Sequence, residues 1–156
     1  MIIPIAESGL DWAQAYDWPV RVYYEDTDAG GVVFYANYLK FMERGRTEWL
    51  RALGVEQRQL LEETGIGFVV VQLDMQYRAP AKLDDQLIVQ TTLTQVGRAS
   101  LNFAQRIILS GKVLTEGNIR VGSVKLSSLK PTALPSPLLE MIKNLEKGSL
   151  CSLAHR

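Results

Sequence analysis

The chain has 156 residues, of which 47% are hydrophobic and 22% charged, and 17 basic side chains balance 17 acidic ones. This length and composition predict a single globular domain over residues 1–156. The charge balance excludes a net field that would hold nucleic acid or an anionic membrane. No apolar run reaches the ~18 residues of a transmembrane helix, and the N-terminus lacks the basic region of a signal peptide. We therefore expect a cytoplasmic protein with at most peripheral membrane contact.

Cysteine and histidine are almost absent, which narrows the chemistry. Cys151 and His155 are the only ones, and both lie near the end of the chain. A disulfide within one chain is impossible, which fits a reducing compartment. A Ser-His-Asp triad or a Cys-His pair is not expected, because its histidine would come from the tail, and a zinc site lacks the cluster of His and Cys that it needs. If the chain is an enzyme, its acid or base is expected to be a carboxylate, with tyrosine or lysine behind it.

The first half of the chain predicts an arm, a strand and a long helix. Residues 1–17 have no clear period and are expected to form a loosely held arm. Residues 18–25 alternate apolar and polar side chains, which predicts a strand with one buried face formed by Val20, Val22 and Tyr24. Residues 37–53 repeat apolar side chains at three- and four-residue steps, the pattern of an amphipathic helix of about five turns.

Two glycines and an asparagine mark this helix. Asn37 is expected to cap its first turn, and Gly54 to end it. Gly45 lies inside it, where glycine costs about 1 kcal/mol relative to alanine. We attribute Gly45 to the close approach of another backbone, such as a sheet wrapped around the helix.

The second half predicts a short helix and four strands. Residues 55–65 form the helix, which Gly65 ends, and residues 137–147 form a terminal helix before a tail, 146–156, that frays. Short turns between the strands indicate antiparallel hairpins, with Gly117 and Gly122 as candidate bulges. The strands are expected at residues 68–77, 86–96, 100–109 and 113–126. On the first of them, one face is formed by Val69, Val71, Leu73, Met75 and Tyr77.

The order of elements is strand, long helix, short helix and four antiparallel strands. This predicts an α+β fold in which one sheet curls around one central helix. Residues 68–71 are apolar on both faces. Either a second subunit covers one face, or the stretch is a core strand buried within one chain.

The stretch EDTDAGG, residues 25–31, allows several interpretations. It suits a solvated acidic turn, and Glu25, Asp26 and Asp28 are candidate magnesium ligands. An EF-hand is excluded, because Gly30 and Asn37 stand where that loop needs oxygen ligands. A catalytic loop is the last alternative. A carboxylate beside two glycines lies near backbone that can approach a ligand closely, and the N–H groups of the following helix can polarise a carbonyl oxygen.

Residues 20–54, VRVYYEDTDAGGVVFYANYLKFMERGRTEWLRALG, resemble the hotdog-fold acyl-CoA thioesterases of the 4-hydroxybenzoyl-CoA thioesterase type. The YbgC-like, Tol-Pal-associated bacterial branch is most similar. Residues 68–85, 103–108 and 129–135 agree with it, so the likeness spans residues 18–140. The resemblance implies the hotdog fold, a five-stranded antiparallel sheet wrapped around a long central helix. It also implies a homodimer joined edge to edge, paired in many members into a homotetramer, with sites at the subunit interface.

The resemblance also implies roles for residues. Asp28 is implied as the catalytic carboxylate, acting as nucleophile or as general base on water, and the backbone N–H of Tyr35 as the group that polarises the carbonyl. Many members of the branch have histidine where this chain has Tyr35. The substrate-binding residues implied beside them are Gly30, Gly31, Val32 and Asn37.

Further residues are candidates for the site, and some also have a structural interpretation. Glu43 on the central helix is a second candidate carboxylate, although an ion pair with Arg44 or Arg46 also explains it. Lys82 and Arg98 are candidates for contacts to CoA phosphates, and Asp84 and Asp85 are interpreted as a turn.

The expected function is hydrolysis of an acyl-CoA thioester without a metal or cofactor, CoA being part of the substrate. The alternative is a non-catalytic hotdog protein that binds an acyl group or an acyl carrier protein in envelope or lipid metabolism. The sequence does not distinguish short, long and aromatic acyl groups, and it does not distinguish CoA from acyl carrier protein as the thiol carrier.

Overall fold

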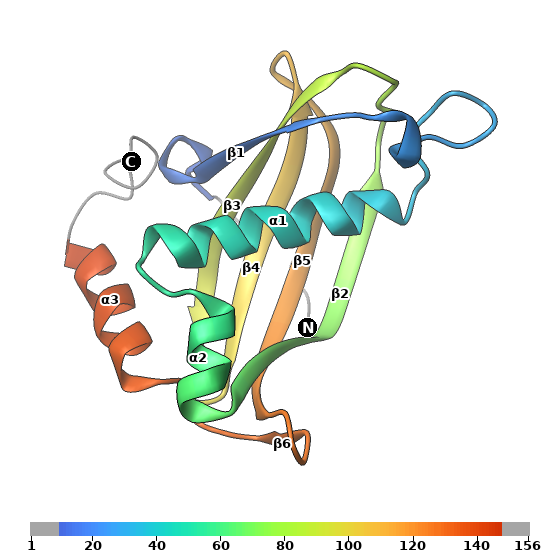
Figure 1. The fold of residues 1–156 in the computed structure, drawn as a ribbon. Helices are drawn as coiled ribbons and strands as arrows, with labels where there is room; N and C mark the ends of the chain where they lie inside the picture. Colours follow the sequence, from blue (N-terminus) through green and yellow to red (C-terminus); the bar gives the residue numbers. More distant parts are fainter. Residues whose placement is uncertain (1–9, 148–156) are drawn as a thin grey trace.

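A computed structural model describes residues 10–147 of the chain. One long helix, α1, lies across the inner face of a curled antiparallel sheet (Figure 1). The strand order is β1-β3-β4-β5-β2, and the two-residue strand β6 pairs with β5. The strands are β1 (Tyr16–Arg21), β2 (Ile66–Tyr77), β3 (Gln86–Val96), β4 (Ser100–Leu109), β5 (Lys112–Lys125) and β6 (Lys130–Pro131).

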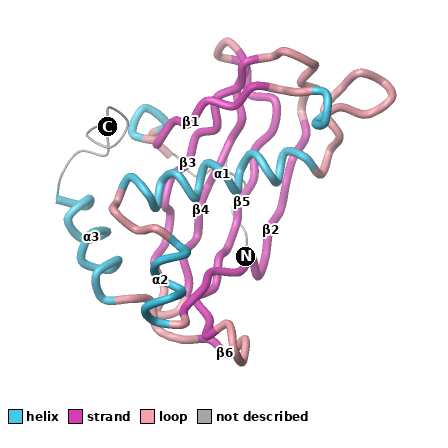
Figure 2. Tube along the Cα trace, in the orientation of Figure 1, coloured by secondary structure: helices cyan, strands magenta, loops and turns pink. Residues whose placement is uncertain are grey.

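The helices lie mainly on one side of the sheet, as the tube in Figure 2 shows. The α-helices are α1 (Asn37–Ala52), α2 (Gln57–Thr64) and α3 (Ser136–Lys147), and the short 3-10 helices are η2 (Trp12–Gln14) and η3 (Tyr24–Asp26). This is the predicted α+β arrangement of a sheet curled around a central helix. No helix in the described part of the chain is long and apolar enough to cross a membrane.

The core lies between α1 and the sheet. Trp49 of α1 meets Phe103 of β4 edge to face, with ring centroids 5.2 Å apart. A Cβ added at Gly45 would lie 2.7 Å from Cγ1 of Val89 on β3. The sheet approaches Gly45 closely, as predicted, but the contacts are made by its side chains and not by another backbone. Both predicted helix stops are also confirmed, because Gly54 and Gly65 have φ of 89° and 72°.

The N-terminal part of the fold differs from the prediction. The first strand runs over residues 16–21, and the chain turns into η3 where the strand was expected to continue. Tyr24 is consequently 82% exposed, so its predicted place on the buried face is wrong, while Val20 and Val22 are buried. Residues 10–17 also have defined structure, where a loose arm was expected. Asp11 caps η2, and the ring of Trp12 lies 4.5 Å from the Arg106 guanidinium.

Gly117 and Gly122 do not form the bulges predicted for them. The pairing of β2 with β5 shifts between Val70 and Gln72 instead, leaving Val71 as the extra residue. Val70 and Leu73 therefore both face the cleft beside α1. The face predicted for this strand is right from Leu73 onward and wrong before it, because the bulge reverses the alternation.

The predicted terminal helix is present as α3, which includes residues 146 and 147 of the expected fraying tail. Leu138 and Ile142 of α3 join the core. Cys151, His155 and the remainder of that tail lie outside the described residues, as do residues 1–9.

Candidate active site

The EDTDAGG stretch ends in a small closed loop ahead of α1. Thr27 and Val33 form an antiparallel bridge, and the N–H of Asp28 donates to the carbonyl of Val32 at 2.9 Å. Gly31 closes the turn by donating to the carbonyl of Asp28, with φ of 81°. The loop projects from the body of the fold beside the first turn of α1 (Figure 1). The turn is closed by these hydrogen bonds, and its tip is exposed.

The Asp28 carboxylate is exposed and is oriented by its own loop. Its Oδ1 accepts a 2.8 Å hydrogen bond from the N–H of Gly30. A Cβ at Gly30 would lie 3.2 Å from this oxygen, tighter than most contacts of that kind. The other oxygen, Oδ2, accepts no hydrogen bond from the described residues. The loop thus fixes one carboxylate oxygen and leaves the other available to a water or a substrate.

Asp26 has a different role from Asp28, although only two positions separate them. Its carboxylate is buried and accepts from the N–H of Tyr23 at 2.8 Å and from the side-chain amide of Asn37 at 2.6 Å. Asn37 is also buried, and it does not cap the helix: the cap position is Ala36, without a side-chain hydrogen bond. The predicted cap is therefore wrong, and the amide nitrogen of Asn37 holds Asp26.

The candidate N–H of Tyr35 lies just before α1. The N–H of Asn37 donates to the carbonyl of Phe34 at 2.8 Å, and the N–H of Phe34 donates to the carbonyl of Asp26 at 3.0 Å. The N–H of Tyr35 between them has no acceptor among the described residues. The hydroxyl of Tyr77 on β2 donates to the Tyr35 carbonyl at 3.0 Å. This backbone is thus held in place, with the Tyr35 N–H free at the positive end of a helix.

The two candidate cations are far apart. Lys82 forms a bridge with Val32, so it lies beside the Asp28 loop just before β3 begins. Arg98 lies in the turn after β3 ends, where its carbonyl accepts from the N–H of Leu134. Because β3 has 11 residues, about 30 Å separates its two ends at ~3.3 Å per residue. One CoA bound by one chain therefore cannot contact both cations through the same phosphate.

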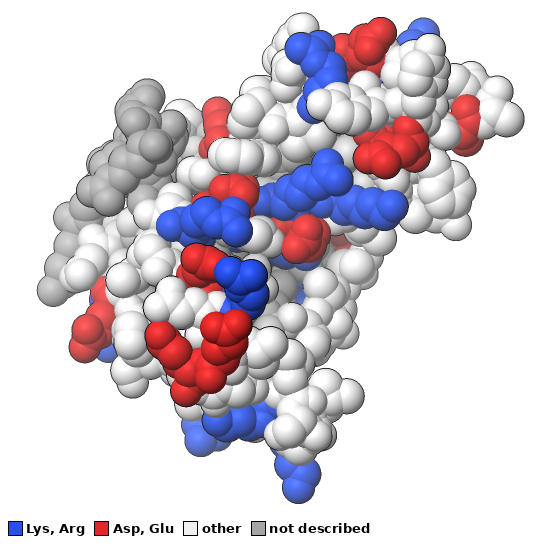
Figure 3. All heavy atoms as spheres, in the orientation of Figure 1, with Lys and Arg blue, Asp and Glu red and all other residues white. Residues whose placement is uncertain are grey.

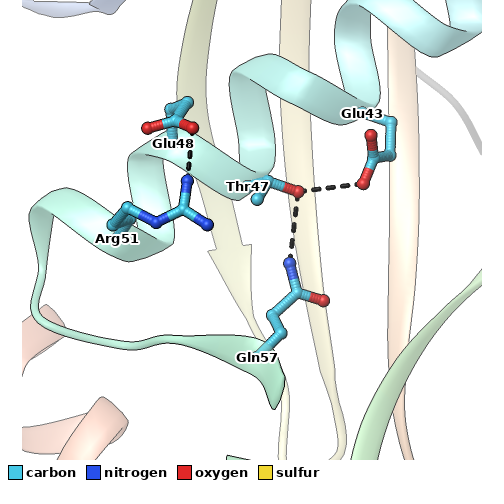
Figure 4. Close-up of polar contacts among 5 residues, drawn as sticks. All are labelled: Glu43, Thr47, Glu48, Arg51 and Gln57. Carbon is cyan, nitrogen blue, oxygen red and sulfur yellow. Dashed lines mark hydrogen bonds and ion pairs between the residues drawn. The ribbon is translucent and has the colours of Figure 1, made fainter. Parts of the chain in front are cut away.

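Glu43 accepts a hydrogen bond from a neighbouring side chain and does not form the predicted ion pair with Arg44 or Arg46. The Thr47 hydroxyl donates to Glu43 Oε1 at 2.9 Å, and the Gln57 amide donates to the Thr47 oxygen at 3.2 Å (Figure 4). Neither Arg44 nor Arg46 forms a salt bridge with Glu43 among the described residues. The three linked side chains connect α1 to α2 and orient the carboxylate on α1.

A cleft runs between α1 and the strands β2 and β5. Its wider part has a volume of about 550 Å³, with Leu39, Leu73 and Ile119 as apolar walls. A deeper part of about 110 Å³ continues toward α2, between Thr47 and Phe68. Both parts are lined by Glu43, Arg46 and Val70.

The sequence interpretation missed the contact between Arg46, which lines the cleft, and Gln105, which is buried behind it. Nη1 of Arg46 donates to Oε1 of Gln105 at 2.9 Å. The Gln105 amide donates in turn to the carbonyl of Met42 and to the Thr91 hydroxyl. Gln105 is fully buried on β4, and a polar side chain in an otherwise apolar strand face was the available signal. Burial lowers the pKa of Arg46 to about 10, and the charge of Glu43 opposes that shift.

The exposed surface around the cleft carries both signs of charge. Figure 3 shows basic side chains along α1, where Lys40, Arg44 and Arg51 are exposed, and acidic side chains gathered over α2. No group of three or more Asp, Glu, His or Cys side chains within residues 10–147 is arranged to hold a metal ion. Asp26, one of the three candidate magnesium ligands, already accepts two hydrogen bonds.

Comparisons with known proteins agree with this fold. Residues 30–115 match the family described as "Thioesterase superfamily", a match that begins two residues after Asp28. The chain is 45% identical over 131 residues to "Acyl-CoA thioesterase YbgC" of Haemophilus influenzae, covering 84% of this chain and 96% of the relative. It is 46% identical over 129 residues to "Acyl-CoA thioester hydrolase YbgC" of Escherichia coli O157:H7, covering 82% and 96%.

Solved structures of thioesterases share the architecture. A structure described as a probable thioesterase from Bartonella henselae superposes with a TM-score of 0.75 at 31% identity. The match covers 78% of this chain and 99% of that one. The resemblance found in the sequence is thus confirmed, with the hotdog fold it implied. A sheet curled around α1, a matching family model and relatives at 45% identity establish that the chain belongs to the thioesterase superfamily, with YbgC proteins among its relatives.

Proposed function

We propose that the chain hydrolyses the thioester bond of an acyl-CoA, releasing the free acid and CoA. Relatives at 45% and 46% identity named as acyl-CoA thioester hydrolases support this activity. The observation that supports this site is the orientation of the Asp28 carboxylate. It accepts a hydrogen bond from the Gly30 N–H in a hydrogen-bonded loop directly ahead of α1.

In the proposed reaction the thioester carbonyl lies between Asp28 and the start of α1. The Tyr35 N–H donates to the carbonyl oxygen, where negative charge develops as the tetrahedral intermediate forms. Asp28 acts either as general base, taking a proton from the attacking water, or as nucleophile, forming an acyl anhydride that water then hydrolyses. In both routes the C–S bond breaks, and CoA leaves as a thiolate that takes up a proton. Tyr35 stands where many branch members have histidine, so it contributes its backbone and no imidazole.

Gly30, Gly31 and Val32 are proposed to line the path of the substrate, because they form the exposed loop beside Asp28. Lys82 is the better candidate for a CoA phosphate contact, since its bridge to Val32 puts it beside this loop. Arg98 lies at the other end of β3 and would reach only a CoA held mainly by another subunit.

We further propose a cytoplasmic homodimer that joins through β2 and pairs into a tetramer. Strand β2 is at the edge of the sheet, and Val70, Val71 and Leu73 are exposed on it. An apolar edge strand that is not shielded favours pairing with another strand. The acyl donor is proposed to be CoA or acyl carrier protein, with no further cofactor. The alternative is a non-catalytic partner that binds acyl groups or acyl carrier protein, with a link to the Tol-Pal system.

The test is thiol release from short, long and benzoyl-type acyl-CoAs by wild type and Asp28→Asn. Asparagine keeps an oxygen that can accept from Gly30, so the turn is preserved while the carboxylate is lost. We expect kcat to fall about 100-fold or more, the scale of general-base contributions, with an unchanged melting curve. Glu25→Gln, at an exposed neighbouring carboxylate, is the matched control and should keep its turnover.

Two other outcomes would redirect the proposal. Equal turnover in wild type and Asp28→Asn, with loss in Glu43→Gln, would move the catalytic carboxylate to α1. If no acyl-CoA or acyl carrier protein ester is hydrolysed, the binding role replaces the enzymatic one.

A further inference from the structure

The deep end of the cleft holds an arginine whose charge is only partly compensated. Arg46 is half-buried, and its hydrogen-bond partner is the neutral oxygen of Gln105 at 2.9 Å. Within the described residues, no carboxylate lies within 4.0 Å of its guanidinium. A guanidinium has five N–H donors, and a buried cation without a counter-ion is costly. An oxygen acceptor arriving in the cleft would complete this group.

The surroundings of Arg46 favour a ligand with a polar end. Glu43, Thr47 and Gln57 face the same small cavity, while Phe68 and Phe103 form apolar walls. Thr47 already donates to Glu43, and the amide nitrogen of Gln57 is directed to Thr47. These hydrogen bonds leave Arg46 as the strongest available donor in the cavity.

The rest of the cleft suits an aliphatic chain. Leu39, Leu73 and Ile119 line its wider part, and Leu39 lies in the first turn of α1, next to the proposed thioester position. From Asn37 to Arg46 the helix advances about 14 Å, at ~1.5 Å per residue. An acyl group that starts at Asp28 therefore passes these apolar side chains, with the charged Lys40, Glu43 and Arg44 beside them, before it reaches the smaller cavity that Arg46 also lines.

We propose that Arg46 is a specificity-determining residue, and that the preferred substrate is a medium-chain acyl thioester with an oxygen at its distal end. This inference rests on the proposed thioesterase function and adds the class of acyl group. The distal oxygen belongs to an ω-hydroxyl or an ω-carboxylate, and both accept a hydrogen bond from Arg46. A carboxylate carries its own charge and can accept two parallel N–H bonds from a guanidinium, which a hydroxyl cannot, so the ω-carboxylate is expected to give the larger effect.

The test compares octanoyl-, decanoyl- and dodecanoyl-CoA with their ω-hydroxy and ω-carboxy forms. We expect kcat/KM for the best oxygenated ester to exceed that of the plain ester of equal length about tenfold, the scale of one charge-assisted hydrogen bond. Arg46→Met should abolish this ratio while it keeps turnover of the plain ester. Arg51→Met is the control, because Arg51 is exposed and pairs with Glu48 on the outside of α1 (Figure 4).

A second measurement keeps the proposal testable if Arg46→Met folds poorly after losing its contact with Gln105. Calorimetry with wild type should show tighter binding of decanedioic acid than of decanoic acid, and the exposed control Arg51→Met should preserve that order.

Three outcomes separate the possibilities. Turnover of plain esters with no preference for an ω-oxygen overturns this inference and leaves the thioesterase proposal standing. No thiol release from any ester overturns the thioesterase proposal, while the calorimetry still tests the cavity. Dissociation of Arg46→Met into monomers with an unchanged substrate ratio would assign Arg46 to a contact between two copies of the chain, which also overturns the inference.

Discussion

The side-chain amide of Asn37 donates a 2.6 Å hydrogen bond to the carboxylate of Asp26, and both side chains are buried. The carbonyl of Asp26 also accepts from the N–H of Phe34. The first residue of α1 is thereby joined to the segment that leads into Asp28. The position of the loop relative to the helix depends on this buried pair.

Asn37→Ala should lower the free energy of unfolding by about 1–3 kcal/mol, because it removes one of the two donors to a buried carboxylate. Urea denaturation measures the change. Glu25→Gln, at the exposed neighbour, should stay within about 0.5 kcal/mol of wild type. An equally small change in Asn37→Ala would mean that the pair contributes nothing to stability.

Gly45→Ala should destabilise the fold although alanine is the better helix former. The gain in helix propensity is about 1 kcal/mol. The added Cβ would lie 2.7 Å from Val89 Cγ1 and 3.0 Å from Thr91 Oγ1, and overpacking of this kind costs about 1–3 kcal/mol. Thermal melts of Gly45→Ala in the wild-type and Val89→Ala backgrounds provide the check. The added methyl should cost less where Val89 is shortened, and an equal cost in both backgrounds would contradict the steric explanation.

Val71→Lys should shift the proposed dimer toward monomer. Val71 is the extra residue of the β2 bulge and is 56% exposed. A charged side chain on an edge strand opposes pairing with a second edge. Sedimentation velocity over a range of concentrations reports the association state, and Val96→Lys at the end of β3 is the control. If Val71→Lys associates as wild type does, the interface lies away from this part of β2.

Alkaline pH should destabilise the protein through its buried tyrosines. Burial raises the pKa of Tyr38 above 10.0, and the hydrogen bond from the Ala81 N–H opposes the shift in part. The neutral phenol is favoured in the folded state, so its stabilisation is complete below pH 10 and is lost as pH rises through the folded pKa. The pKa of the buried Tyr16 shifts in the same direction, and partial burial has the same effect on the half-exposed Tyr77.

Denaturation curves between pH 9 and 11 for wild type and Tyr38→Phe isolate the contribution of Tyr38. Wild type should lose more stability than the variant over this range. The pH dependence of stability that comes from Arg46 has the opposite sign, since its pKa is lowered to about 10. Arg46 is present in both proteins, so its contribution cancels in the comparison. Parallel pH profiles would mean that Tyr38 ionises equally readily in both states.

Periodicity predicted the elements well because it reflects burial directly. The three- and four-residue pattern of α1 and the alternation in β3 and β4 correspond to faces that the core covers. The bulge at Val71 could not be predicted in this way, because no glycine marks it. Gly117 and Gly122 instead lie where side chains of the neighbouring strand β2 approach closely: a Cβ at Gly117 would clash with Met75 Sδ.

The candidate site was predictable only in part. The EDTDAGG motif indicated a loop, but not which carboxylate is buried, because Asp26 and Asp28 look alike in the sequence. The partner of Asp26 is eleven residues away, beyond local patterns. Arg46 and Gln105 were missed because they come from a helix and a strand 59 residues apart, and only the folded chain brings them together.

The β-bridge between Val32 and Lys82 limits the part of the Asp28 loop that can be redesigned. Together with the bridge between Thr27 and Val33, it fixes both stems of the Asp28 loop to backbone that is already anchored. Residues 29–31 are exposed between these anchors. Substitutions and insertions next to the proposed reaction centre can therefore be confined to Ala29, because Gly30 and Gly31 hold the Asp28 turn, while the sheet and α1 keep their native sequence.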